Sequence, residues 1–259
     1  MDSSSRFASP PCRTAIARAR ELWSPSTGPR ARLQTAQEVY RFNNTFGHLV
    51  WYLRNQKVAS QSIISMLRRE WGSRKFQFQS FVLPHELKNF PNRRRGDLTF
   101  TVVREPLAAA RAAYLEVSRR ERGGAQYGSD DYRSLPCGPA SAAARYRAFL
   151  RGARAGRSLG AETFHAFPQA LKLSVSSWVD AIVRLERLTD DGPDSGGALR
   201  RKVGVSLASL QSAPPVHATA TTTHSPCSFN LTELTPEMCD LYEADFACLP
   251  YERPAACVT

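Results

Sequence analysis

The sequence predicts an α/β domain in which a parallel sheet is covered by helices on both faces, giving three layers. Two stretches carry this prediction. The apolar run His48–Leu53 is followed by a polar loop and then by apolar residues at helical spacing over Ile63–Leu67. The β-branched run Leu98–Val103 is followed by Arg104 and by a strongly helical segment that starts at Pro106. Two successive strand–loop–helix units favour parallel strands flanked by helices.

The length of 259 residues allows one sizeable core and a poorly ordered end. We expect residues 1–37 to be a disordered or targeting segment, because they are rich in Ser, Pro, Ala and Arg and poor in acids. Residues 38–259 are expected to form a single domain. No apolar run reaches the roughly 18–20 residues of a membrane span. We therefore expect a protein that is soluble or associates with a membrane peripherally.

The remaining elements follow from local patterns along the chain. Pro84, Pro91 and Gly96 punctuate a region that is mostly loop and short strand. The later segments comprise a Gly- and Tyr-containing loop that suits a lid, a helix, a strand, an irregular stretch and a closing helix with a Thr cap. In chain order these are Arg122–Pro139, Ala140–Arg154, Val179–Leu185, Gly204–Cys227 and Thr235–Leu249.

The net charge of +12 favours anionic partners such as a phosphorylated cofactor, an acidic polysaccharide or nucleic acid. The six cysteines contain no CxxC pair and no zinc pattern, so they are either reduced thiols or include a C-terminal disulfide of a secretory protein. Two sequons, Asn43–Thr45 and Asn230–Thr232, fit the secretory alternative. The compartment stays open at this point.

A lysine and hydroxyl loop follows the first strand, and an arginine follows the second. The carboxyl ends of parallel strands are where α/β sheets bind ligands, and the N-terminus of a helix attracts anions. Ser60 is positioned to cap the helix, and Lys57 supplies a full charge near it. The alternative is an ordinary capped turn with a solvated lysine. The chain has no GxxxxGK[ST], GxGxxG, GxSxG or HExxH motif.

Five segments in order resemble the PAPS-dependent sulfotransferases, especially their carbohydrate (Golgi-type) branch. Lys57–Ile63 is similar to the family's 5′-phosphosulfate loop, and Val102–Tyr114 to its 3′-phosphate motif. Three shorter matches lie downstream, at His165–Gln169, Ile182–Glu186 and Leu241–Tyr251. The resemblance implies a P-loop-NTPase-like sulfotransferase fold, PAPS as co-substrate, no metal, and a carbohydrate-like acceptor.

The resemblance also implies roles for individual residues. Lys57 would stabilise charge on the transferred sulfuryl group, and His85 is the first choice for the base that deprotonates the acceptor, with Glu86 as second choice. The alternative for His85 is an ordinary surface histidine in a Pro-bounded loop, and His165 is expected to be structural. The implied cofactor-binding residues are Lys57, Val58, Ala59, Ser60, Gln61, Ser62, Arg104 and Ala112.

Three positions depart from the family pattern. Gln61 replaces a Thr or Ser of the first loop, Ala112 replaces the Ser that shares the 3′-phosphate, and Ala109 replaces an inner Arg. Arg111 lies about 100° around the helix from position 112, so it is an imperfect substitute. A weak or inactive site that binds anionic ligands is therefore the second hypothesis.

The third hypothesis is a basic nucleic-acid-binding protein. It ranks last, and no nucleic-acid partner is expected, because the arginines are scattered along the chain and the sequence contains no known nucleic-acid-binding module. The family resemblance implies the Golgi or secretory lumen, although the sequence as written shows no anchor or signal peptide. An organelle reached through an N-terminal transit segment, or the cytoplasm, is the alternative.

Overall fold

The computed structural model describes residues 7, 9–23, 38–55, 59–77, 96–122, 130–138, 140–154, 166–173, 179–210 and 234–257. Its strands are β1 (Glu38–Asn43), β2 (Leu49–Leu53), β3 (Arg74–Gln77), β4 (Leu98–Val103) and β5 (Ala181–Arg184). Its α-helices are α2 (Pro10–Trp23), α3 (Ser60–Trp71), α4 (Pro106–Arg122), α5 (Asp130–Ser134), α6 (Ala142–Arg154), α8 (Gln169–Leu173), α9 (Gly196–Val203), α10 (Thr235–Leu241) and α11 (Glu243–Cys248). Short 3₁₀ turns lie at Leu185–Arg187, Ala208–Leu210 and Ala255–Cys257.

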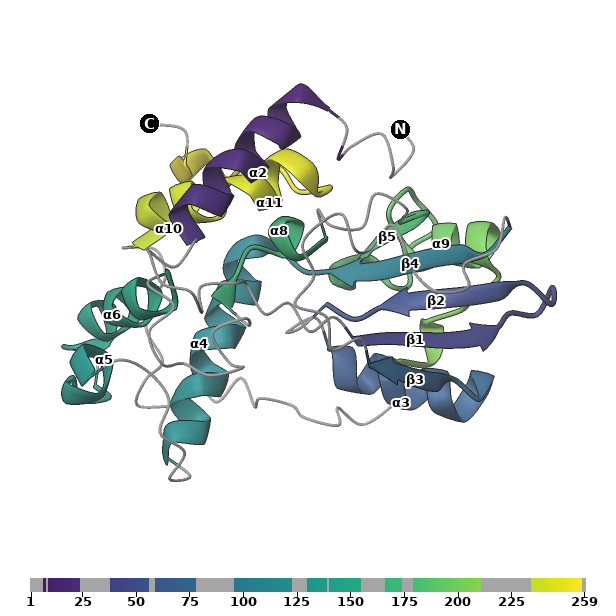
Figure 1. The fold of residues 1–259 in the computed structure, drawn as a ribbon, viewed down its shortest axis with the longest axis horizontal. Coiled ribbons are helices and arrows are strands. Elements are labelled where there is room, and N and C mark those ends of the chain that lie inside the picture. The colour runs from purple at the N-terminus through teal and green to yellow at the C-terminus, as the bar shows by residue number, and fades with distance from the viewer. Residues whose placement is uncertain are drawn as a thin grey trace.

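The described strands form one sheet in the order β3-β1-β2-β4-β5. Strands β2, β4 and β5 are parallel, with Val50 opposite Leu98 and Phe100 opposite Ala181. The prediction that the two apolar runs are neighbouring parallel strands is confirmed. The expected all-parallel sheet is corrected at β1, which pairs antiparallel with both β2 and β3. The sheet is therefore mostly parallel, and Figure 1 shows helices around it.

The antiparallel pairing of β1 and β2 follows from the tight turn between them. The side-chain oxygen of Asn44 accepts hydrogen bonds from the backbone N–H groups of Phe46 and His48. Gly47 completes the turn at φ 76°, a left-handed conformation that glycine adopts without strain. A connection this short can join only antiparallel strands, because a parallel pair needs a crossover of a dozen or more residues.

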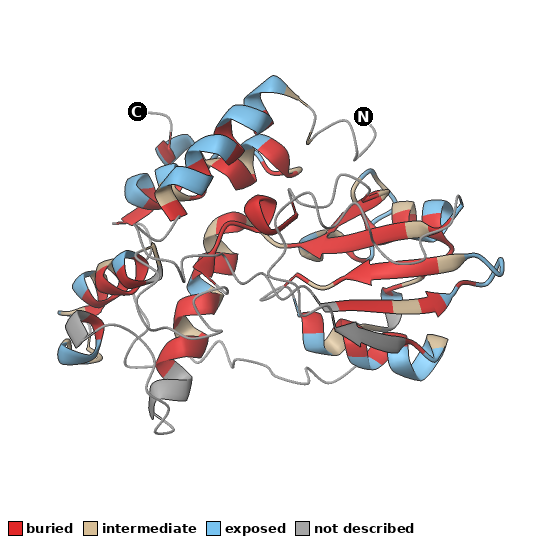
Figure 2. Cartoon of the chain, in the orientation of Figure 1, coloured by how far each residue is buried: buried red, intermediate tan, exposed pale blue. Residues whose placement is uncertain are grey.

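Alternating side chains of each strand pack on opposite faces of the sheet, and each face is covered by its own helices. Trp51 and Leu53 pack with α2, α4, α6, α8, α10 and α11. Val50 and Tyr52 pack with α3 and α9. This gives the expected three layers, and Figure 2 shows β2 and β4 buried along most of their length.

The N-terminal segment corrects the expected domain limits. Residues 10–23 were predicted to be poorly ordered, yet they form α2, which buries Ile16 and Trp23 in the core. The indole N–H of Trp23 donates to the carbonyl of Leu241, and α2 packs against α11 (Figure 1). Proline at the first turn and apolar residues on one face make this segment an amphipathic helix in spite of its Ala- and Arg-rich composition.

The closing helix is divided in two where one continuous helix was predicted. Leu234, and not Thr235, is the N-cap of α10, and Tyr242 separates α10 from α11. The backbone of Tyr242 leaves the helical region (φ −108°, ψ 19°), while its ring is buried and its hydroxyl donates to the carbonyl of Ala166. Burial of this one side chain together with its hydrogen bond fixes the break.

Three further differences concern elements that local patterns hide. Strand β1 and helix α9 were not predicted, and the expected lid loop contains the short helix α5. The predicted helices of the two strand–loop–helix units, α3 and α4, are confirmed, as are α6 and β5. None of the helices in the described ranges has the length and apolarity needed to cross a membrane.

The sequence left open whether the cysteines are reduced thiols or include a C-terminal disulfide, and the structure contains disulfides. Cys12 of α2 is bonded to Cys248 of α11, and Cys239 is bonded to Cys257. Cys137 is also disulfide-bonded. The second pair is the C-terminal disulfide that the sequence left open. The first joins the two ends of the chain across 236 residues and was not predicted.

Candidate functional site

The carboxyl ends of the three parallel strands bring the described candidate residues to one edge of the sheet. Arg54 and Asn55 follow β2, Arg104 and Glu105 follow β4, and Arg184 ends β5. Because β2 and β4 are neighbours in register, the residues that follow them leave the sheet side by side. The prediction that Arg104 lies at this edge is confirmed. Lys57, Val58, His85 and His165 lie outside the described residues.

The N-terminus of α3 has an unusual cap. Ala59 is the N-cap residue and adopts a left-handed conformation with φ 55° and ψ 27°. This conformation costs a non-glycine residue about 1 kcal/mol. The predicted cap, Ser60, is instead the first residue of the helix, and its side chain is buried. The described residues place no side-chain acceptor on this helix end and no acid in its first turn.

Arg54 lies against this same helix end, and sequence reasoning missed it. Its Nε donates to the hydroxyl of Ser60 over 3.4 Å. A guanidinium beside the N-terminus of a helix places two positive charges together, an arrangement that an anion stabilises. A signal was present in the sequence, because Arg54 follows β2 directly, just as Arg104 follows β4.

The other two residues of the predicted loop differ in exposure. Gln61 is exposed and Ser62 is half-buried, one residue further into α3. Both belong to the first turn of α3, where backbone N–H groups have no partner within the helix. An anion held at this helix end would have these backbone N–H groups as donors.

Two buried amide side chains hold the backbone of Arg104. Gln169, the first residue of α8, accepts from the Arg104 N–H at 3.0 Å and donates to the Arg104 carbonyl at 2.7 Å. Asn55 donates both to Gln169, at 2.8 Å, and to the carbonyl of Val102. The ends of β2 and β4 are thus tied together through α8, and the backbone from which the half-buried Arg104 side chain extends is fixed.

The N-terminus of α4 is closed by its own chain. The carboxylate of Glu105 accepts from the backbone N–H groups of Leu107, at 3.1 Å, and Ala108, at 2.6 Å. A carboxylate in this position satisfies the dipole and the free donors of the helix, and it repels a second anion. An anion near this unit must therefore be held by the Arg104 side chain.

The departures from the family motif lie further along α4. Ala112 is half-buried, and Ala109 is buried with 7% of its surface exposed. Arg111 is exposed on another side of the helix and has other contacts, so it does not replace the missing donor at position 112. Neither Ala109 nor Ala112 has a polar side-chain atom, so neither side chain can donate a hydrogen bond to an anion.

The end of β5 adds a third polar cluster to the same edge. Glu186 accepts from the backbone N–H of Glu105 and from the hydroxyl of Tyr251, both at 2.8 Å. The guanidinium of Arg184 stacks over the Tyr251 ring at 4.6 Å. Burial, followed by the charge of Glu186, raises the pKa of Tyr251 far above its ordinary value, so this hydroxyl stays protonated. The cluster locks the C-terminal chain onto the sheet edge.

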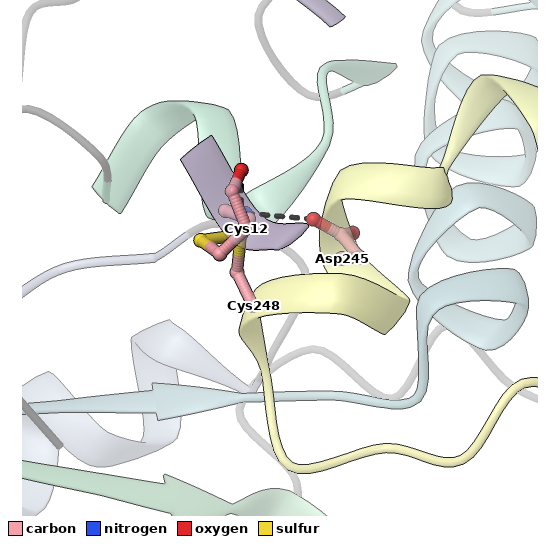
Figure 3. The surroundings of a disulfide bond; sticks show 4 residues. Cys12, Asp245 and Cys248 are labelled. Atoms are coloured by element: carbon pink, nitrogen blue, oxygen red, sulfur yellow. Dashed lines mark hydrogen bonds between the residues drawn. A yellow bond between two sulfur atoms is a disulfide. The ribbon is translucent and has the colours of Figure 1, made fainter. Parts of the chain in front are cut away.

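Behind Gln169 lies a buried carboxylate. Asp245 of α11 is fully buried and accepts from the backbone N–H of Ala170 at 2.7 Å. Burial raises its pKa to about 6, and hydrogen bonds from Ala170 and Gln169 offset part of the effect. Figure 3 shows Asp245 on the same short helix as Cys248, which is bonded to Cys12. The disulfide therefore anchors the helix that orients α8, and α8 holds Arg104.

The described part of the chain contains no cluster of His, Cys, Asp and Glu that could hold a metal ion. The groups gathered at the sheet edge are mainly cationic side chains and helix N–H donors, which suit a phosphate or sulfate ester. No family model, no curated protein and no solved structure matches this chain.

Proposed function

We propose that this chain transfers a sulfuryl group from PAPS to a hydroxyl of a carbohydrate-like acceptor. The observation that carries the proposal is the N-terminus of α3, where Ala59 is left-handed, the described residues place no capping side chain, and the Arg54 guanidinium lies against Ser60. That donor set fits a phosphate or sulfate ester. Arg104 directly follows the neighbouring strand β4 and suits a second phosphate on the same ligand.

The proposal includes a P-loop-like sulfotransferase fold. Support comes from the parallel pairing of β2 and β4, each followed by a loop and a helix, within three layers. The antiparallel β1 extends the sheet on the side of β2 away from β4, so it leaves the two strand ends undisturbed.

The residues at this edge of the sheet suit different parts of PAPS, which supplies the activated sulfuryl group. The first turn of α3, with Ser60, Ser62 and Arg54, would bind the 5′-phosphosulfate, and Arg104 would bind the 3′-phosphate. Lys57, in the loop that leads to Ala59, would neutralise charge on the sulfuryl group as it is displaced in line. Catalysis of this kind consists of positioning and electrostatic stabilisation.

His85 is proposed as the base that takes the proton of the acceptor hydroxyl, since an imidazole titrates in the required range. His85→Ala should lower turnover at least about 10²-fold while 3′,5′-ADP affinity stays unchanged. His48→Ala is the matched control, because His48 is exposed in the β1–β2 turn at the other end of the sheet. A loss of less than a few-fold would return His85 to the role of an ordinary loop residue.

The first experiment is calorimetric titration with 3′,5′-ADP, with 5′-AMP in parallel. The proposal predicts micromolar binding that requires the 3′-phosphate. Equal affinity for both nucleotides, or no binding, would overturn it. Steep salt dependence with indifference to Lys57→Ala would instead favour the nucleic-acid alternative.

A second candidate function is binding of sulfated or phosphorylated ligands without transfer. Ala112 and Ala109 favour it, because neither can donate to a 3′-phosphate, and Glu105 closes the helix end beside them. Binding of 3′,5′-ADP without turnover across an acceptor screen would support this candidate. The disulfides support placement of either candidate in the Golgi or secretory lumen.

A further inference from the structure

The turn between β1 and β2 carries a feature that the proposed function does not use. It contains the triplet Asn43-Asn44-Thr45, which has the Asn-x-Thr pattern of an N-glycosylation acceptor. Asn43 is the last residue of β1, and both Asn43 and Thr45 are exposed. The acceptor amide is therefore on the surface of the folded chain, and the hydroxyl of Thr45 donates to the carbonyl of Gly204 at 3.5 Å.

The middle residue of the triplet has a different role, which leaves Asn43 as the accessible amide. Asn44 is buried, and its side-chain oxygen accepts from the N–H groups of Phe46 and His48. Its side-chain nitrogen donates to the carbonyl of Val203 at 2.7 Å. Asn44 thus holds the turn against the end of α9, while Asn43 beside it projects from the end of the strand.

The same turn exposes an aromatic ring. Phe46 has 68% of its surface exposed, and it is the large hydrophobic residue that stands out as exposed in the described ranges. Its ring lies against Gly204, where an added Cβ would come within 2.7 Å of the ring carbons. The rest of the ring faces solvent. The C–H face of a pyranose attached three residues away is apolar and of a size to cover it.

The disulfides give an independent reason for the compartment that this modification needs. Cys12–Cys248 and Cys239–Cys257 form and persist in an oxidising environment such as the secretory lumen. The lumen in which such bonds form is also where oligosaccharides are transferred to Asn-x-Thr triplets.

From these observations we infer that Asn43 carries an N-linked glycan. In the transfer, the Asn43 side-chain nitrogen forms a bond to C1 of the first sugar and loses a proton. The bond between C1 and the oxygen of a lipid-linked diphosphate breaks, and the lipid diphosphate leaves as the anion. No oxidant or reductant takes part.

The glycan would leave the candidate site open. The turn precedes β2, whereas Arg54 follows it, so the five residues of β2 separate the two by about 16 Å. Figure 1 shows the β1–β2 connection at the end of the sheet opposite the start of α4. The inference does not depend on sulfuryl transfer, because it concerns the other end of the sheet.

The test is expression of the full chain behind a cleavable signal sequence in a eukaryotic secretory host, scored only on signal-cleaved molecules. Release of glycans by peptide-N-glycosidase in heavy-oxygen water converts a glycosylated Asn into a labelled Asp. We expect this label at position 43 in the peptide of residues 42–54. Unmodified Asn43 in that peptide would overturn the inference.

Variants separate this site from the second sequon and from folding effects. Asn43→Gln and Thr45→Val should remove the label and its glycan mass, Thr45→Ser should retain them, and Asn230→Gln should leave them unchanged. Retention of the label in Thr45→Val would overturn the assignment. Enzymatic removal of the glycan should lower the melting temperature of the wild type more than that of Phe46→Ala. Equal losses would overturn the role given to Phe46.

Discussion

The two strand–loop–helix units of this protein have the same local plan and opposite helix ends. In the unit of β2 and α3, the helix starts from a left-handed Ala59, and the described residues place no capping side chain at this helix end. The guanidinium of Arg54 lies against the same helix end. In the unit of β4 and α4, the helix starts at Pro106 and is closed by the carboxylate of Glu105. The first end is strongly positive, and the second is already neutralised.

The difference shows that a strand–loop–helix pattern alone does not specify an anion site. Whether a helix end can bind an anion depends on what its first-turn N–H groups contact. In α3 the described residues leave these groups open to a ligand, whereas in α4 the carboxylate of Glu105 accepts from them. The two units should therefore contribute differently to one ligand. Unit β2–α3 would bind through backbone N–H groups, and unit β4–α4 through the Arg104 side chain.

The largest effect should come from the loop of the first unit. Lys57→Ala should lower sulfuryl transfer by about 10²–10³-fold, because a preorganised charge at the displaced group is lost. Transfer from labelled PAPS to an acceptor mixture measures it, with Lys202→Ala on α9 as the control. Full turnover in Lys57→Ala would rule out the proposed mechanism.

The two arginines should distinguish the units by nucleotide. Arg104→Ala should weaken 3′,5′-ADP roughly 10–100-fold and leave 5′-AMP unaffected, since it removes a charge-assisted hydrogen bond to the 3′-phosphate only. Arg54→Ala should weaken both nucleotides by a similar factor. Calorimetry measures both, with exposed Arg69→Ala as the control. Equal losses of both nucleotides in Arg104→Ala would contradict the division of roles.

The ionisation of Asp245 should make the free energy of unfolding depend on pH. The pKa of Asp245 in the folded state is about 6, above its ordinary value of 3.8. Because the folded protein favours the protonated carboxyl, the free energy of unfolding is highest below about pH 4, where this group is protonated in both the folded and the unfolded state. That stability is lost as pH rises through about 6. Asp245→Asn should therefore match the wild type near pH 4 and be more stable by about 2–3 kcal/mol at pH 7. Urea unfolding at both pH values measures this. A constant difference across the range would contradict the assignment.

The smallest effects should come from the two helix ends themselves, and they should have opposite signs. Glu105→Ala should lower the free energy of unfolding by about 1 kcal/mol through loss of the cap. Ala59→Gly should raise it by about 0.5–1 kcal/mol, because glycine adopts φ 55° without strain. Chemical denaturation measures both. A destabilised Ala59→Gly would show that Ala59 is not strained.

Much of the fold could be predicted because it depends on local patterns. The apolar runs of β2 and β4, the helical spacing of α3 and the proline that starts α4 gave correct elements and a correct parallel pair. Strand β1 was missed because its identity depends on pairing with β2 and β3 on either side. Helix α2 was missed because its Ala- and Arg-rich composition hides an apolar face.

The site divides in the same way. Sequence reasoning placed Arg104 and the start of α3 at the carboxyl edge of the sheet, and it gave the cap to Ser60 instead of Ala59. It missed Arg54 although this residue follows β2 directly, and it missed Asn55 because the partners of Asn55, Val102 and Gln169, are distant in the sequence. The capping role of Glu105 was also missed, since Glu is an uncommon cap and the position reads as part of a motif.

The sequence by itself determined strands β2 and β4, helices α3 and α4, and that one of these strand ends carries a cationic residue, Arg104, at the carboxyl edge of the sheet. These properties follow from the periodicity of neighbouring residues, which each segment carries independently. Only the tertiary structure decided how that edge is held. Asn55 meets Gln169 across 114 residues, and Cys12 meets Cys248 across 236. Such pairings depend on how the whole chain closes around its core, and no local pattern encodes them.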